Sequence, residues 1–339
     1  MKRSRFDILI PFAIVGLMLA LKHLLPGNKG FFLQVIMYTI YVMGNNILMG
    51  YMGYVSFGQP VYLSLGGYAA GLYLFYHGGS PLVALGLSVL IGVAAGGIMG
   101  PVLIRLRGSY FTLVNAAFCA IGVFTFETLL INLTNGNNGL LFRSKMGKGF
   151  DFLDLRRPDN FYLFALAILL VVLLLYRKMD RSTLGALFRA TEKNERRMKF
   201  FGYNTFNIRW LGFVLAAVLS TTAGGLFALN NAMINPSLGE QSRASEVVVA
   251  TLMGGSGTVY GPFLGALAFL GIKEVISSLI GRWEFLVGVL TLVIMFKFPM
   301  GIGGFLSYLF RRKVTVTSVS DRLPALKAAA PAGKPPESA

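Results

Sequence analysis

The chain has 339 residues, of which 55% are hydrophobic and 13% are charged, and its formal net charge is +17. This composition is outside the range of soluble domains and indicates an integral membrane protein. The excess of Lys and Arg could suggest nucleic-acid binding, but these residues stand at the ends of apolar runs, where membrane topology signals lie, so no nucleic-acid partner is expected.

Apolar runs follow one another along most of the chain. They are continuous, whereas the strands of a membrane barrel alternate apolar and polar residues, so the runs predict helices. Most are long enough to span a bilayer, whose core is crossed by about 20 helical residues. The runs cover residues 7–25, 31–49, 61–76, 81–104, 109–131, 160–176, 210–230, 262–280 and 284–298. The predicted fold is therefore all-α, a polytopic transmembrane bundle of about 8–10 helices with short broken helices.

The first run, 7–25, follows a basic start and could imitate a secretory signal. A retained first helix is favoured, because the run is long and no small-residue cleavage pattern precedes Lys22. Cytoplasmic loops are enriched in Lys and Arg. This rule places the N-terminus, the loop 105–107 and the segment 177–209 in the cytoplasm, and 133–159 outside.

A shorter apolar run at 245–254 is either a further span or a re-entrant half-helix. If it crosses, the basic residues 311–313 lie in the cytoplasm, which favours a total of about ten helices. Residues 1–310 then form the transmembrane domain, with 177–209 as a cytoplasmic loop within it. Residues 311–339 are rich in Ala, Pro, Ser and Lys, which predicts a disordered cytoplasmic tail.

Two glycine-rich segments, GYMGYVSFGQP (50–60) and GGSGTVYGP (254–262), interrupt apolar regions and break helices at membrane depth. Non-helical backbone persists there only where protein covers it or where it lines a watery cavity. The segments therefore either border a substrate path or form tight turns between short helices. Glu127, in a nearby span, either belongs to the path or reaches the interface. The residues expected along a path are Asn45, Asn46, Gly53, Ser56, Gln59, Asn115, Glu127, Gly254 and Gly257.

The stretch RSTLGALFRATEKNERRMKFFGY (181–203) is highly charged, unlike the chain around it. Leu184, Leu187 and Phe188 recur at helical spacing, which predicts a short amphipathic helix. Gly202 is its expected C-cap. Such a helix lies either on anionic lipid or in the groove of a soluble partner. Acidic residues within its basic face favour the protein partner.

No catalytic constellation is recognisable in the sequence. The two histidines, His23 and His77, stand at span ends without a zinc or nucleophile motif. Cys119 is the single cysteine, which excludes an internal disulfide and a cysteine-rich metal site. The sequence contains no GxxxxGK[ST] loop, so any ATP would be bound by a partner. We therefore expect no catalytic residues, metal ligands or cofactor in this chain. We do not expect the protein to be an enzyme.

Five motifs occur in a fixed order over nearly the whole span region. They are GYVSFGQPVYLSLGGYAAG (53–71), RLRGSYFTLV (105–114), TNGNNGL (134–140), RSTLGALFRATEKNERRMKFFGYN (181–204) and GGSGTVYGPFLGA (254–266). In sequence and spacing they resemble motifs of the membrane permease subunits of ABC importers for branched-chain amino acids. That family also includes permeases for urea and other small solutes.

The resemblance implies a multi-pass permease subunit in a bacterial inner membrane that translocates branched-chain amino acids or a related small polar solute. It also implies several partners: a second permease, expected to be a distinct chain, two cytoplasmic ATPases that bind ATP, and a periplasmic or lipid-anchored solute-binding protein. The family usually has His where this chain has Gln59 and an acid where it has Ala120, which leaves urea or amide transport open. The alternative outside the ABC importers is a secondary transporter that works alone. It would need charged residues in mid-membrane, and the central spans carry few.

The segment 181–203 resembles the cytoplasmic coupling loop of the family, which contacts the ATPase. Closure of the ATPase pair on ATP would move this helix as a lever, and rigid helices would pass the shift to the translocation path. The residues expected at the contact are Gly185, Leu187, Phe188, Arg189, Ala190, Glu192, Asn194, Glu195 and Gly202.

Overall fold

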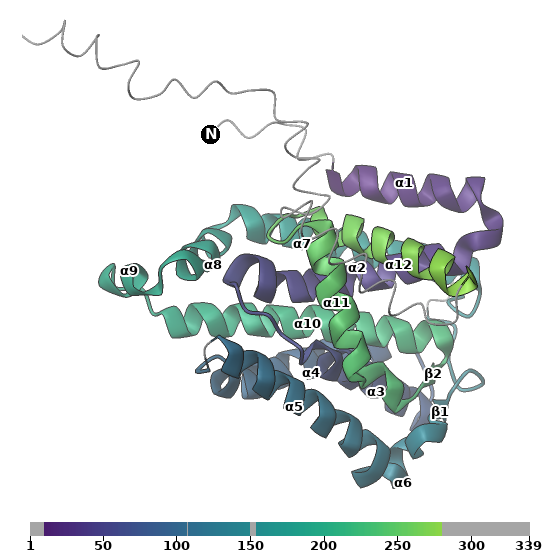
Figure 1. Ribbon diagram of the computed structural model, residues 1–339. Helices are drawn as coiled ribbons and strands as arrows, with labels where there is room; N and C mark the ends of the chain where they lie inside the picture. Colours follow the sequence, from purple (N-terminus) through teal and green to yellow (C-terminus); the bar gives the residue numbers. More distant parts are fainter. Residues whose placement is uncertain (1–9, 107, 150–153, 280–339) are drawn as a thin grey trace, which may run out of the picture.

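The computed structural model describes residues 10–106, 108–149 and 154–279, most of which are helical (Figure 1). Within these residues, five helices are long and apolar enough to cross a membrane. They are α2 with its π-helical end (Lys29–Asn46 and Ile47–Tyr51), α4 (Pro81–Leu103), α5 with its π-helical end (Ser109–Phe124 and Thr125–Leu129), α7 (Pro158–Arg181) and α10 (Thr205–Asn231). The predicted all-α polytopic bundle is confirmed.

Shorter elements complete the described part of the chain. Four helices of intermediate length are α1 (Ile10–Leu24), α3 (Gln59–Tyr76), α11 (Gln241–Gly254) and α12 (Gly261–Leu279). Three small helices are α6 (Ile131–Thr134), α8 (Thr183–Lys193) and α9 (Glu195–Phe200). Two short strands, β1 (Leu140–Leu141) and β2 (Met233–Ile234), pair antiparallel, with Leu140 opposite Ile234. The predicted runs up to residue 280 match these helices, whereas the run 284–298 and the tail 311–339 lie outside the described residues.

The centre of the bundle is the packing of α10 against α2, α3 and α4. Small residues bring the helices together: Gly66 of α3 lies directly on the backbone of Thr221 in α10. In the reverse direction, Gly224 of α10 lies on the carbonyl group of Leu63 in α3. Without a strong hydrophobic drive between helices in lipid, such backbone approach is a main source of packing energy.

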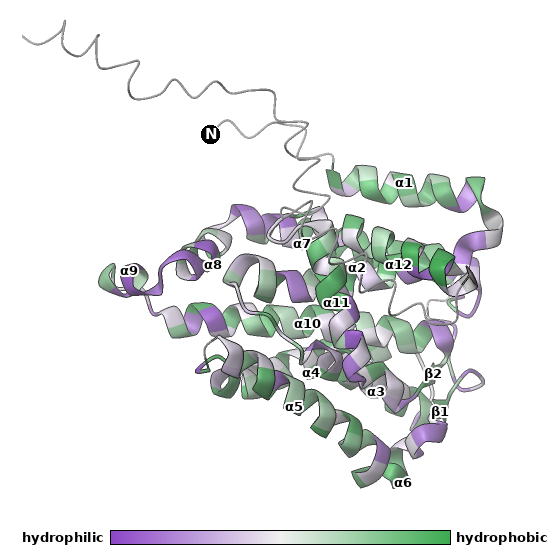
Figure 2. Ribbon diagram, viewed as in Figure 1, coloured by the Kyte–Doolittle hydropathy of each residue, from purple (hydrophilic) through white to green (hydrophobic). Residues whose placement is uncertain are grey.

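Burial separates central from peripheral helices. In α2, 89% of the apolar window is buried, against 22% in α4 and in α5. The outward sides of α4 and α5 carry large apolar side chains such as Leu90, Ile98 and Leu113. Figure 2 shows α5, in front, as predominantly hydrophobic. The surfaces of α4 and α5 therefore suit lipid or another membrane subunit.

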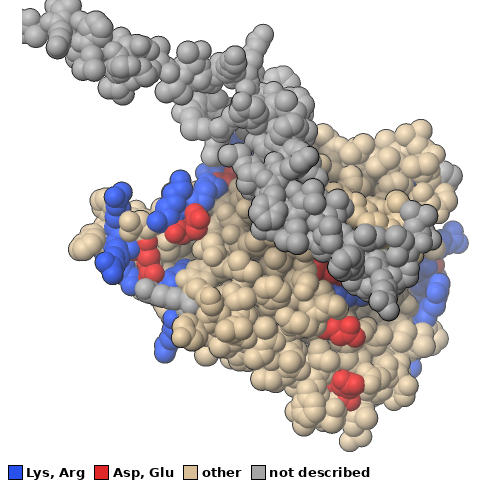
Figure 3. All heavy atoms as spheres, in the orientation of Figure 1, with Lys and Arg blue, Asp and Glu red and all other residues tan. Residues whose placement is uncertain are grey.

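Charged side chains gather at the two ends of the bundle, with an uncharged belt between them (Figure 3). We call the end that carries α8 and α9 the α8 end. Arg105 stacks over the ring of Phe206 at 5.9 Å, so the loop before α5 also lies at the α8 end. Lys22 and Lys29 pair with Asp159 at 3.4 and 2.9 Å, so the α1–α2 turn and the start of α7 share the opposite end. Arg105, from the loop predicted on the same side as 177–209, thus lies at the same end as that segment.

Helices α11 and α12 pack against each other and on α2. Helix α11 has 14 residues and is about 21 Å long, which is shorter than a bilayer core of about 30 Å. The connection 255–260 between the two helices is not helical and contacts Asn46 and Gly50, close to the α8 end of α2. The run 245–254 is therefore a short helix that brings the chain near the α8 end, from which α12 returns.

Candidate functional site

The charged stretch 181–203 forms two helices at the end of the bundle. The predicted single amphipathic helix is interrupted at Asn194, whose backbone is extended (φ −158°) and whose Oδ1 accepts the N–H of Arg197 at 3.0 Å. The stretch is therefore α8, a cap and α9, because Asn satisfies the first amide groups of a helix better than it continues one. Gly202, at φ +81°, ends α9 as predicted, since its N–H and that of Tyr203 bond back to the last turn.

The apolar side of α8 packs against the permease itself. Phe188 is fully buried, and Thr191 is 7% exposed. Gly185 lies on the last carbonyl groups of α7, where a Cβ would come within 2.6 Å of the oxygen of Met179. Phe188, which the sequence assigned to the partner contact, is thus covered by the chain itself, because the periodic pattern marks the side that is buried but not the molecule that buries it. Leu187 and Ala190 are half-buried beside it.

The outward side of α9 carries aromatic residues that the sequence reasoning missed. Phe200 is 90% exposed and Phe201 is 77% exposed, and they follow the basic residues of α9. We call Phe200, Phe201, Arg196 and Arg197 the docking patch. Lys and Arg at this end form the cluster on the left of Figure 3. A signal was present in the sequence, since two adjacent aromatic residues directly follow the basic residues of a short helix.

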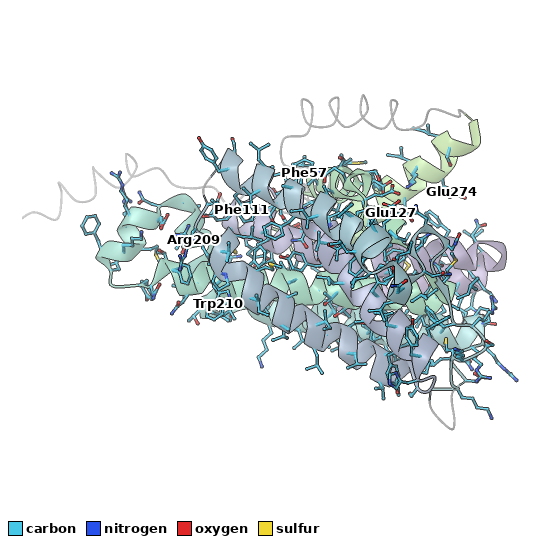
Figure 4. All side chains as sticks on the ribbon, turned by 90° about the horizontal axis from the view of Figure 1, so that it is seen from below. Phe57, Phe111, Glu127, Arg209, Trp210 and Glu274 are labelled. Atoms are coloured by element: carbon cyan, nitrogen blue, oxygen red, sulfur yellow. The ribbon has the colours of Figure 1, made fainter. Side chains whose placement is uncertain are left out.

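A buried ion pair attaches α9 to the body of the protein. The side chain of Arg209 on α10 is 7% exposed and contacts Glu195 at 2.5 Å. Arg209 also donates to the hydroxyl of Tyr54 at 2.6 Å and to the carbonyl of Thr205 at 3.3 Å. Figure 4 shows Arg209 at the α8 end. Glu195, expected to contact a partner, thus ties α9 to α10 and to the non-helical segment 53–58.

Gly53, expected along a substrate path, lies against α8 instead. Its backbone has φ +71°, and a Cβ there would come within 2.9 Å of the Cγ atom of Glu192. Both residues line a cavity of about 570 Å³ at the α8 end, which also involves Thr112 and Arg209. The structure therefore brings together two residues that sequence reasoning assigned to separate functions.

A series of polar contacts leads from α8 into the bundle. Arg189 donates to Asp180 at 2.6 Å, and the hydroxyl of Tyr51 donates to the same carboxylate at 2.9 Å. The ring of Tyr51 packs edge-on against Tyr176, with centroids 5.8 Å apart. The hydroxyl of Tyr176 accepts from the amide of Asn46 at 2.7 Å. We call these five residues the polar relay.

The polar relay ends at the second glycine-rich segment. Asn46 Oδ1 accepts the N–H of Gly257 at 2.9 Å, and its amide nitrogen donates to the carbonyl of Thr258 at 3.1 Å. Gly257 has φ +76°, a conformation that favours glycine. Gly254 allows the close approach of α11 to α12, since a Cβ there would meet the backbone of Gly265. Asn46 and Gly257, both expected along a path, thus lie in contact, and the polar relay connects them to α8.

Four of the remaining path candidates are buried inside the bundle, and they are Gln59, Asn115, Ser56 and Asn45. Gln59 accepts the hydroxyl proton of Ser220 at 2.6 Å in the centre of the bundle. Asn115 is buried beside Gly58, close to the buried Ser56. Asn45 is also buried and donates to Thr251 of α11 at 2.8 Å.

Glu127 is separate from all of these residues. It accepts from Asn137 at 2.5 Å in the loop beyond α6, and Figure 4 shows it well away from Arg209. The interfacial alternative for Glu127 fits this position.

Comparison with known proteins finds three relatives with the same kind of name. The chain is 26% identical over 300 residues to the high-affinity branched-chain amino acid transport system permease protein LivM of Salmonella typhimurium, covering 81% of this chain and 70% of the relative. It is 26% identical to LivM of Escherichia coli, covering 78% of this chain and 67% of the relative. A shorter match, 32% identical over 130 residues, is to the permease protein BraD of Pseudomonas aeruginosa, and it covers 37% of this chain and 41% of the relative. No solved structure matches the chain.

All these relatives are named as transport permeases. The family model that matches the chain is described as the permease component of branched-chain amino acid transport systems. It covers residues 29–296, which includes the bundle, the polar relay and both glycine-rich segments. The apolar helices of the structure agree with a multi-pass membrane protein. The chain therefore belongs to the family of permease components of branched-chain amino acid transport systems.

Proposed function

We propose that the chain translocates branched-chain amino acids across the bacterial inner membrane as one permease of an ABC importer. The family and the names of its relatives support this solute class. In the complete importer, this chain pairs with a second, distinct permease, and a solute-binding protein delivers the amino acid from outside. Two cytoplasmic ATPases supply the energy, and the α8 end faces them.

The observation that carries the proposal is the position of α8 and α9. The two helices stand at the end of the bundle, with the docking patch directed outward and their other side fixed to the body (Figure 1). Exposed aromatic and Arg side chains are the residue types that dominate protein interfaces. Phe188 and the Glu195–Arg209 pair anchor the helices from behind, so a push on the docking patch reaches α7 and α10.

We expect the double variant Phe200→Asp, Phe201→Asp to lose the ATPase. Two carboxylates in the docking patch would be desolvated without a partner on association, and the aromatic anchors would be gone. Because both side chains are exposed, the permease should still fold and insert. The measurement is the amount of ATPase recovered when the tagged permease, expressed with its partner subunits, is purified in detergent.

The matched control for this experiment is Leu141→Asp, at a residue that is 65% exposed at the opposite end of the bundle. It should recover the ATPase as the wild type does. Undiminished recovery by the double Phe variant would remove the docking patch from the ATPase contact. That outcome would leave the lipid surface as the alternative contact of α9.

A further inference from the structure

Helix α2 carries a row of polar side chains inside the bundle. Tyr38, Tyr41 and Asn45 follow one another at helical spacing and share one side of the helix. All three are buried, and among the described residues neither tyrosine hydroxyl has a hydrogen-bond partner. The same holds for the side-chain oxygen of Asn45. We call these three residues the α2 row.

A carboxylate of α11 joins the α2 row. Oε2 of Glu246 is buried and has no hydrogen-bond partner within the described residues. Glu246 acts electrostatically on both Tyr38 and Tyr41. Asn45 donates its amide hydrogen to Thr251 of the same α11 at 2.8 Å. The α2 row therefore faces α11, and these two helices carry four buried oxygens that have no hydrogen-bond partner among the described residues.

These four buried oxygens do not stabilise the fold. A buried polar group without a partner costs free energy, and native proteins contain few of them. Phenylalanine at positions 38 and 41 would fill the same space without that cost. Polar groups retained at the expense of stability, and concentrated in one place, are typical of a functional site.

The hydrogen-bonding chemistry of the four oxygens indicates which kind of ligand they can bind. An amide oxygen and a carboxylate oxygen only accept hydrogen bonds, and phenol groups can accept as well, so the group they receive is a donor. The carboxylate favours a positively charged donor. Lys273 of α12, 2.8 Å from Glu246, and Arg243, 3.9 Å from it, place positive charge beside the row. The rings of Tyr38 and Phe269, stacked at 5.9 Å, add an apolar wall.

We propose that the α2 row and Glu246 form a transient binding site for the ammonium group of an amino acid during translocation. The inference rests on the proposed function and deepens it. Adjacent cations and aromatic rings suit the carboxylate and the aliphatic side chain of the same solute.

The packing of α11 and α12 on α2 encloses the site. The turn between these two helices is held by Asn46 through Gly257 and Thr258, at the end of the polar relay. Gly255 and Gly257, at φ +95° and +76°, form this turn. A movement of α8 thus reaches the element that covers the α2 row, which connects the site to the ATPase end.

The test is Tyr41→Phe in the complete importer, reconstituted in proteoliposomes. We expect the initial rate of ATP-driven leucine uptake, at saturating leucine-loaded binding protein, to fall about tenfold, the effect of one lost hydrogen bond to a charged group. The melting temperature should be unchanged or higher, because an unpaired hydroxyl has been removed from the interior. ATPase recovery should equal that of the wild type.

Tyr68→Phe is the matched control. Tyr68 of α3 is also buried, and its hydroxyl has no partner in the described part of the chain, but its ring stacks on Phe126 away from the α2 row. It should keep full uptake. Equal uptake by the two variants would overturn the site, and so would a joint fall of uptake and melting temperature in Tyr41→Phe. If Tyr41→Phe does not fold, Tyr38→Phe carries the same expectation. A wild-type importer that carries no leucine overturns the proposed function itself.

Discussion

Replacing Gly224 by valine should prevent the permease from accumulating in folded form. Gly224 lies where α10 crosses α3, and a Cβ there would collide with the carbonyl group of Leu63 and lie 3.0 Å from the amide nitrogen of Gly67. These are backbone atoms of a buried helix, so no side-chain rotation relieves the overlap. Overpacking in an interior costs about 1–3 kcal/mol and occasionally more, and a backbone collision belongs at the upper end.

The measurement is the height of the monodisperse peak in size-exclusion chromatography of a detergent extract, followed by thermal unfolding. Gly86→Val is the matched control: the residue is also a helical glycine, in α4, but no atom lies within 4 Å of the position its Cβ would take. We expect a wild-type peak for Gly86→Val and a small or absent one for Gly224→Val. Equal peaks would mean that α3 and α10 do not cross at this glycine.

The helices were predictable because a bilayer imposes their length and apolar character. Every predicted run within the described residues corresponds to a helix with ends that differ by a few residues. Each glycine-rich segment contains a non-helical stretch, at 53–58 and at 255–260. The cap at Gly202 was predictable for a similar reason, since few other residues adopt a positive φ.

The contacts between distant segments were not predictable. Asp180 stands between basic residues at the end of α7 and resembles part of a topology signal, yet it joins Arg189 to Tyr51. Nothing in the sequence places Gly53 against Glu192, because only the folded chain brings these segments together. Periodicity identified the apolar side of α8, but the same pattern fits a partner's groove and the protein's own core.

The polar relay should control how much amino acid is transported for each ATP hydrolysed. We expect Asp180→Asn and Asn46→Leu each to lower leucine uptake per ATP about tenfold, since coupling free energies between sites typically correspond to factors of about 5–150. The first variant weakens the attachment of Arg189 and Tyr51 at the α8 end. The second frees the N–H of Gly257 at the far end. Both leave the docking patch intact, so ATPase recovery should not change.

A double-mutant cycle distinguishes a relay from two independent structural effects. If both residues act in one path, Asp180→Asn combined with Asn46→Leu should be no worse than either alone, whereas independent losses would multiply. Glu195→Gln is the matched control, because Glu195 pairs with Lys199 and Arg209 at the α8 end and neither of them has a part in the relay. Its effect should multiply with that of Asn46→Leu. Since the relay ends on the turn between α11 and α12, loss of uptake with retained ATP hydrolysis would mean that this turn no longer follows the movement of α8.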